Sequence, residues 1–288
     1  MFFPQAGAPD PNKSKPIQAV HARAIKNNQS GLNFQESDFE SPETLELIND
    51  LSSEEFKIRN DAINELSKSN DPNVLDSLIK LLSRGDIVSR RSSAYVLGNL
   101  HKPEVIYLLS RVLKEDDEEL IANSIGALEN IVLNRNEQYE LVIDTKINLE
   151  KIDIVSKALI ECLEKLKKNE DYYYTSLSAA LLLGHLGKPE AVEILVDCLS
   201  NSDEDISNRE QAKDSLGKIK DTKTLEQVSP FLSDEYPMRT RQYALDIVSK
   251  LAESKIMTDS TVNSLKKCLR DPDTRIRLIA TEIFKKLF

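Results

Sequence analysis

A small side chain followed four residues later by a large apolar one recurs along most of this 288-residue sequence. The pairs are Ala62/Leu66, Ser93/Leu97, Ser124/Leu128, Ala179/Leu183, Ala212/Leu216, Ala244/Val248 and Ala280/Phe284. Their large members are separated by 31, 31, 55, 33, 32 and 36 residues. A spacing of four lies on one face of a helix, and such a long period is typical of stacked helical repeats. The sequence therefore predicts an all-α, right-handed α–α superhelix, a solenoid of about seven helix pairs.

Most of the predicted repeats also carry charged residues at fixed places before the small residue. Three residues earlier, five repeats have arginine: Arg59, Arg90, Arg209, Arg241 and Arg277. Four residues before that position stand Glu55, Asp86, Asp117, Asp205 and Asp273. An acidic side chain at a helix start accepts hydrogen bonds from free amides. An arginine one turn later can reach a carboxylate of the next repeat, so we expect a structural ladder of ion pairs.

The residue totals argue against several classes of protein. The 38 basic residues against 48 acidic ones give a net charge of −10, which disfavours nucleic acid or an anionic membrane as the main partner. The apolar runs are too short to span a membrane, and residues 1–4 do not start a secretory signal. Cys162, Cys198 and Cys268 are too scattered for a disulfide scaffold or a metal cluster. We therefore expect a cytoplasmic protein with buried thiols, no metal site and no permanently bound cofactor.

The sequence predicts an N-terminal arm, a long solenoid and one insertion. Residues 1–40 begin with a Pro-rich stretch that buries little apolar surface, and residues 17–25 have the spacing of one short helix. Residues 41–288 form the predicted solenoid. The 55-residue interval places an insertion at about 134–171, which we interpret as a long helix from about 152 to 168 together with a loop. Such irregularities tend to shape the binding face of a solenoid.

Two stretches carry a resemblance to a known family. The pattern Arg-x-x-Ala-x-x-x-Leu-Gly-x-Leu-x-x-Pro-Glu is seen best in residues 90–104 and 177–191. It resembles the HEAT-like repeats of the phycobilisome lyase type, and the repeats over residues 45–288 look like the bilin lyases of that family. Those enzymes attach open-chain tetrapyrroles to cysteines of phycobiliproteins. The resemblance thus implies a HEAT/armadillo-like solenoid and a phycobilin lyase, with the phycobilin as substrate and a phycobiliprotein subunit as partner.

The resemblance also bears on the choice of bilin. It favours phycoerythrobilin and phycoerythrin over phycocyanobilin, because this chain is long enough to act without the paired partner that some phycocyanin lyases need. Whether a second lyase subunit takes part stays open. The family also includes non-lyase relatives, so one alternative is a non-enzymatic HEAT-repeat adaptor or chaperone that binds phycobiliproteins in phycobilisome assembly or degradation. Another is a general protein-binding scaffold. No nucleotide-binding, protease or hydrolase motif is present, so catalysis rests on the resemblance alone.

Helical geometry indicates which side chains lie opposite the core on the arginine-bearing helices, the side that the resemblance makes concave. Tyr95, Tyr174 and Tyr243 would stack on the conjugated face of a bilin. Arg239 and Arg241 would hold its propionates, and Asp214 or Asp246 would accept from its pyrrole nitrogens. The acceptor protein supplies the cysteine nucleophile, so the candidate catalytic residues are proton donors. The full candidate set is Tyr174 and His185 as catalytic residues, with Tyr95, Asn123, Ser178, Asp214, Arg239, Arg241, Tyr243 and Asp246 as bilin-binding residues.

Structural interpretations of two of these features stay open. Residues 172–174 form a run of three tyrosines directly after the predicted insertion, where they would also serve to pack or cap a helix. His185 stands one residue after a glycine near a predicted turn, where it would also serve as a capping or solvated residue. The arginine series needs no ligand to explain its period.

Overall fold

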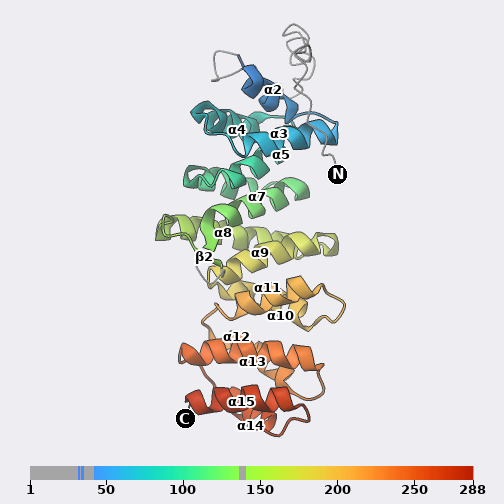
Figure 1. Ribbon diagram of the computed structural model, residues 1–288, viewed down its shortest axis with the longest axis vertical. Coiled ribbons are helices and arrows are strands. Elements are labelled where there is room, and N and C mark those ends of the chain that lie inside the picture. Colours follow the sequence, from blue (N-terminus) through green and yellow to red (C-terminus); the bar gives the residue numbers. More distant parts are fainter. Residues whose placement is uncertain (1–31, 33, 36–41, 136–140, 288) are drawn as a thin grey trace, which may run out of the picture. The chain divides into compact units, whose positions relative to one another are not determined.

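The computed structural model describes residues 32, 34–35, 42–135 and 141–287. The helix predicted at residues 17–25 and most of the predicted arm lie outside these residues. The described parts hold fourteen α-helices, α2 to α15, with short 3-10 helices and one small hairpin (Figure 1). The chain divides after Leu100 into two compact units, and each is described by itself.

The first unit consists of two layers of helices. Its elements are α2 (Pro42–Asp50), α3 (Phe56–Leu66), α4 (Pro72–Arg84) and α5 (Ile87–Asn99). Helix α2 packs on α3 and α4 packs on α5, while α2 also contacts α4 and α3 contacts α5. The Asn99 side-chain amide donates to Ser67 Oγ over 3.1 Å, which ties the ends of two neighbouring helices together.

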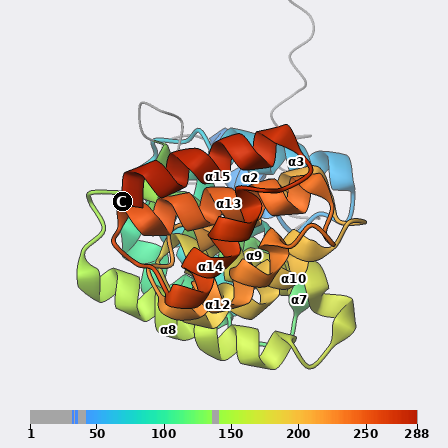
Figure 2. The ribbon, with the colours of Figure 1, turned by 90° about the horizontal axis from the view of Figure 1, so that it is seen from below.

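The second unit continues the same arrangement. Helices α7, α9, α11, α13 and α15 pack side by side, and each also packs against the helix that precedes it. Figure 2 shows α13 and α15 on one side of this unit and α12 and α14 on the other. Its elements are η2 (Pro103–Val105), α6 (Ile106–Val112), α7 (Glu118–Val132), α8 (Leu149–Leu166), η3 (Glu170–Tyr172), α9 (Tyr173–His185), η4 (Pro189–Ala191), α10 (Val192–Ser200), α11 (Ile206–Leu216), α12 (Thr222–Val228), η5 (Ser229–Leu232), α13 (Met238–Glu253), α14 (Asp259–Cys268) and α15 (Thr274–Leu287).

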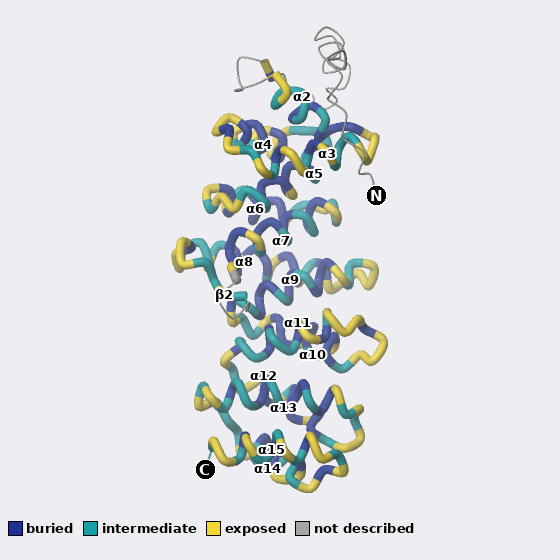
Figure 3. Tube along the Cα trace, viewed as in Figure 1, coloured by how far each residue is buried: buried dark blue, intermediate teal, exposed yellow. Residues whose placement is uncertain are grey.

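The recurring small and large residues form the core, as predicted. Six of the seven pairs are buried in both members, and Phe284 in the last helix is only half-buried. Burying a large aliphatic side chain contributes about 1.5–3 kcal/mol, so the repeat itself supplies much of the driving force for stacking. Figure 3 shows exposed residues gathered in the turns and at the helix ends. The described structure is therefore an all-α solenoid of stacked helix pairs.

Acidic residues cap the helices at the predicted positions. Asp86 Oδ1 accepts from the amides of Val88 and Ser89 at 2.9 and 3.0 Å. Asp117 accepts from Leu120 at 2.8 Å. The expectation fails at Glu55, whose side chain makes no capping hydrogen bond. Its side chain is one methylene longer than that of aspartate, and aspartate is the better N-cap.

The arginine series contacts mainly carbonyl oxygens, which corrects the expected ladder of ion pairs. Arg90 Nε donates to Leu82 O at 2.8 Å, and Arg209 Nε donates to Leu199 O at 3.0 Å. Both carbonyls lie in the last turn of the preceding helix, where such groups lack an intrahelical partner. Arg241 does form an ion pair with the next repeat, and its partner is the buried carboxylate of Asp271. The guanidinium groups thus serve chiefly as C-terminal caps.

The long interval contains a hairpin that the sequence did not predict. Strands β1 (Leu133–Arg135) and β2 (Leu141–Ile143) pair antiparallel, with Leu133 opposite Ile143. Helix α8 follows at Leu149–Leu166, close to the predicted 152–168. Strands of three residues carry too little alternation to be recognised by pattern.

Candidate functional site

The predicted site residues do not form one cluster. Tyr95 lies in α5 of the first unit with 51 % of its surface exposed, whereas all the others lie in the second unit. Within the second unit, Tyr174 and His185 lie at opposite ends of α9. Eleven helical residues span about 16 Å, so these two candidate catalytic residues cannot act on the same atom.

Three of the predicted residues, His185, Asp214 and Asp246, do come together on the face formed by α9, α11 and α13. Lys250 Nζ on α13 lies 3.1 Å from Asp214 Oδ1 on α11, and Lys213 Nζ lies 3.4 Å from the same oxygen. His185 on α9 lies 3.0 Å from Ser215 on α11, measured from Nδ1 to Oγ. We call this group the polar seam and define it as His185, Asp214, Ser215, Asp246 and Lys250.

Glycines allow the helices that carry the polar seam to approach closely. A Cβ atom at Gly184 would lie 2.7 Å from Ser215 Cβ, and one at Gly217 would lie 2.6 Å from Lys250 Cδ. Both distances are far below van der Waals contact. The Leu-Gly step that recurs in the sequence therefore brings polar residues of successive repeats within hydrogen-bond distance.

His185 is held in its neutral form. Burial is the main cause that lowers its pKa below the ordinary value, because a charged ring is poorly solvated there. Nδ1 lies 2.8 Å from Leu181 O, so a neutral ring with its proton on Nδ1 donates to that carbonyl. A neutral ring leaves Nε2 as an acceptor, which suits a base better than the expected proton donor.

The pKa of Asp246 is shifted in the opposite direction, to above its ordinary value. Burial raises its pKa first, and the negative charge of Asp214 raises it further. Lys213 and Lys250 act in the other direction by favouring the carboxylate. Lys213 lies beside the seam, so two acids and two lysines are close together here.

Two predicted bilin contacts are buried, which differs from the expectation. Tyr243 is only 5 % exposed, and the cations of Arg209, Lys213 and Arg239 lie 5.5–6.0 Å from its ring centroid. Arg241 is buried against Asp271. Neither side chain offers a surface to a bilin. The physical reason is that neighbouring helices of the same layer bury these side chains. A helical wheel drawn for one helix does not show which side chains its neighbours bury.

The other predicted contacts keep some exposure. Tyr174 is 67 % exposed and meets Tyr173 edge to face, with 5.2 Å between ring centroids. Ser178 Oγ donates to Tyr174 O at 3.0 Å. Arg239 is exposed and lies 3.9 Å from Glu210 on α11. Asn123 on α7 is half-buried.

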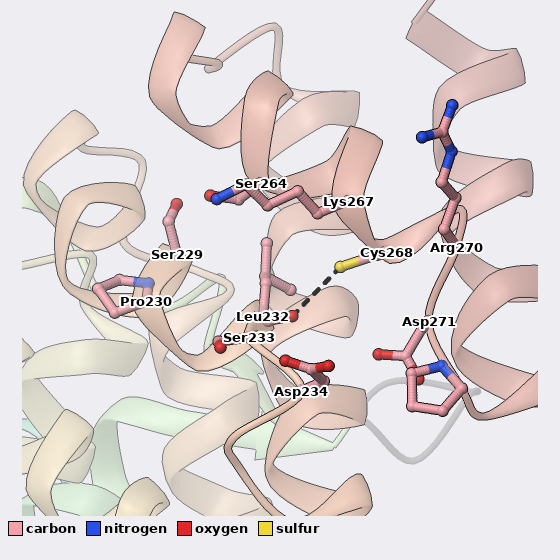
Figure 4. A pocket seen from close by; sticks show the side chains of 11 residues that line it. Ser229, Pro230, Leu232, Ser233, Asp234, Ser264, Lys267, Cys268, Arg270 and Asp271 are labelled. Carbon is pink, nitrogen blue, oxygen red and sulfur yellow. Dashed lines mark hydrogen bonds between the residues drawn. The ribbon is translucent and has the colours of Figure 1, made fainter.

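Two cavities involve residues that the sequence analysis did not assign to a site. One of about 470 Å³ lies between η5 and α14, where Ser229, Ser264, Lys267 and Asp271 line it (Figure 4). The Cys268 thiol donates to Leu232 O there at 3.4 Å, and burial raises its pKa to about 11. The other, of about 320 Å³, lies between the end of α8, the start of α9 and α10. The run of tyrosines at residues 172–174 was the one feature of the sequence that pointed to this second cavity.

Two further searches concern the described residues alone. Among them, no group of three or more His, Cys, Asp or Glu side chains is placed to hold a metal ion. None of their helices combines the length and apolar character that crossing a membrane requires.

The fold and the seam define the class of this protein as an all-α repeat solenoid. Its sequence matches the HEAT repeats family over residues 43–129 and 156–247, which together make up more than half of the chain. The chain belongs to the HEAT repeat proteins. A comparison with curated proteins finds no match.

The solved structures that are similar to this chain include the following three. Human deoxyhypusine hydroxylase in complex with glycerol is 14% identical with a TM-score of 0.36, covering 95% of this chain and 91% of its own. A designed armadillo repeat protein in complex with the peptide (KR)4 is 17% identical with a TM-score of 0.34, covering 84% and 98%. The complex of CpcE and CpcF of phycocyanin lyase from Nostoc sp. PCC7120 is 16% identical with a TM-score of 0.35, covering 88% and 96%. Similarity at this level carries no conclusion about activity.

Proposed function

We propose that this HEAT repeat protein is a binding scaffold that docks a protein partner on the polar seam. The observation that carries the proposal is the Asp214–Lys250 contact of 3.1 Å between α11 and α13, in which both side chains remain 42–49% exposed. Their geometry is fixed by contacts between repeats, while their outer surfaces stay open. Charged groups held in place before binding lose less entropy when a partner arrives.

The seam favours a partner with charges of both signs. It presents a carboxylate and an ammonium group side by side, and a complementary partner would offer the reverse arrangement. Such complementarity contributes mainly specificity and association rate. A HEAT stack leaves the outer face of each helix layer available for this purpose.

The finer proposal is that the partner is a phycobiliprotein subunit and that the scaffold assists bilin attachment. It rests on the resemblance carried by residues 90–104 and 177–191. Tyr174, exposed at the start of α9, remains the best placed of the proposed stacking residues. The bilin's thioether would form with a cysteine of the client, so the scaffold needs no nucleophile of its own.

Binding of an apo-phycobiliprotein subunit tests the proposal. Titration calorimetry should show that replacing both Asp214 and Lys250 with alanine weakens binding about tenfold, a change of about 1.4 kcal/mol. The matched control removes Lys114 and Glu161, which lie 2.9 Å apart on the other layer. Equal losses for the two double variants would exclude the seam as the docking surface.

Pigment transfer separates the lyase from the adaptor. Coexpression with bilin-synthesis enzymes and phycobiliprotein subunits should yield a covalently coloured subunit, detected by absorbance and mapped to one cysteine. Tyr174→Ala should lower the yield without changing the thermal midpoint, because the ring is exposed. Binding of the subunit without any pigment transfer would contradict the lyase function and would agree with a non-enzymatic adaptor.

A further inference from the structure

The cavity at the start of α9 is lined by more acidic than basic side chains. Three carboxylates line it, from Glu170, Glu193 and Asp197, against the single ammonium group of Lys167. Lys167 is already shared, because its Nζ lies 3.3 Å from Glu193 and 3.4 Å from Glu164. The lining therefore carries an excess of negative charge around an opening of about 320 Å³.

One wall of the cavity is apolar and aromatic. Tyr173 and Ile194 both line it. The Tyr173 hydroxyl donates to Glu204 Oε2 at 2.8 Å, and this bond fixes the ring from the side of the next loop. A tyrosine ring held in this way is a suitable partner for a cation–π interaction.

The cavity also contains a serine hydroxyl. Ser176 lines the cavity and is only 5 % exposed. Within the described residues no side-chain hydrogen bond is formed by it, whereas Ser178 in the same helix donates to the carbonyl four residues earlier. Because Ser176 lines the cavity, its hydroxyl is placed to accept a hydrogen bond from a ligand bound there.

We infer that this cavity binds the guanidinium group of an arginine side chain presented by a protein partner. A guanidinium group is planar, donates up to five hydrogen bonds and stacks on aromatic rings. The carboxylates would accept from it, Tyr173 would face it, and Ser176 Oγ would accept one further hydrogen bond. The methylene stem would contact Ile194.

The electrostatics of Asp197 agree with this assignment. Burial raises its pKa first, and the charge of Glu193 raises it further. An arriving cation would offset both effects, since an opposite charge favours the carboxylate. The two acids are four residues apart on α10 and therefore lie on one face of the helix.

This inference deepens the proposed function, on which it rests for the identity of the partner as a protein. It adds an anchor at the opposite end of α9 from His185. A scaffold with two separate contacts gains affinity when both are engaged by one partner.

Calorimetry with short peptides tests the cavity by itself. The probe is acetyl-Gly-Gly-Arg-Gly-Gly-amide, and its control replaces arginine with citrulline, which has nearly the same shape and no charge. The arginine peptide should bind at least about tenfold more tightly, because hydrogen bonds between charged groups are stronger than those that a neutral group donates. A lysine peptide should bind more weakly than the arginine peptide, because it lacks the planar fork.

Variants then locate the binding. Glu193→Gln, Asp197→Asn and Ser176→Ala should each weaken arginine-peptide binding several-fold, with unchanged helical circular dichroism. Glu190→Gln is the matched control, because it removes the same charge from an exposed residue outside the cavity. Equal binding of the citrulline or lysine peptide, no binding of any peptide, or an equal effect of Glu190→Gln would overturn the inference. The phycobiliprotein titration reports on the seam instead, so the two proposals fail separately.

Discussion

Asp214 and Lys250 stand 36 residues apart in the sequence and meet at 3.1 Å, from carboxylate oxygen to ammonium nitrogen, between α11 and α13. Because both are partly exposed, their pairing should stabilise the fold by only about 0.2–1 kcal/mol. A double-mutant cycle with Asp214→Ala and Lys250→Ala, measured by urea denaturation, should give a coupling energy in that range. A coupling well above it would mean that the pair is a structural clamp and not an open docking element.

Arg241 should matter far more for stability than its exposed neighbour. Removing one partner of a buried ion pair leaves an uncompensated charge, at a cost of about 3–5 kcal/mol. Arg241 and Asp271 have side-chain exposures of 8% and 2%, so Arg241→Ala should lower the unfolding midpoint strongly. Arg239→Ala is the control, because its partner Glu210 lies 3.9 Å away and both are about half exposed. Similar midpoints for the two variants would contradict the buried position of Arg241.

These contacts show how much of the fold and the site the sequence could predict. The spacing of residues such as Ala212 and Leu216 predicted stacked helix pairs, because that pattern records each helix's own buried face. The burial of Tyr243 could not be predicted, because it depends on which neighbouring helices cover its sides. Nor could the cavity near Ser176, because it arises from the spacing between α8, α9 and α10. The period of the sequence shows which face of each helix is buried. Binding sites depend in addition on the spaces between neighbouring helices, which the period does not show.

Two glycines within α-helices should respond to alanine in opposite ways. A methyl group at Gly184 would meet Ser215 Cβ at 2.7 Å and Leu195 Cδ1 at 3.0 Å, and such overpacking costs about 1–3 kcal/mol. At Gly126 nothing lies within 4 Å of the added atom. Alanine there should stabilise the fold by up to about 1 kcal/mol, because alanine has a better helix propensity than glycine. Chemical denaturation of Gly184→Ala and Gly126→Ala checks both signs. A stable Gly184→Ala protein would argue against the close approach of α9 and α11.

His185 should make stability depend on pH. Its pKa in the folded chain lies below the ordinary value of 6.5, with burial as the main cause. The unfolded chain therefore binds more protons as the pH falls, and the folded state loses stability. The contribution is complete above about pH 6.5 and declines as the pH falls through the lower folded-state pKa. Urea midpoints from pH 8 to pH 5 should fall less in His185→Gln than in the unchanged protein, and identical slopes would contradict a buried neutral ring.

The most direct measurement of the central claim is a map of which helix layer touches the partner. A photo-crosslinking amino acid would replace Gln211, which is exposed on α11 one turn before Asp214, or Glu226, which is exposed on α12 in the other layer. With an apo-phycobiliprotein subunit as partner, docking on the polar seam predicts a strong crosslink from position 211 and a weak one from position 226. A crosslink from position 226 alone would contradict docking on the seam, and none from either position would contradict the proposed partner.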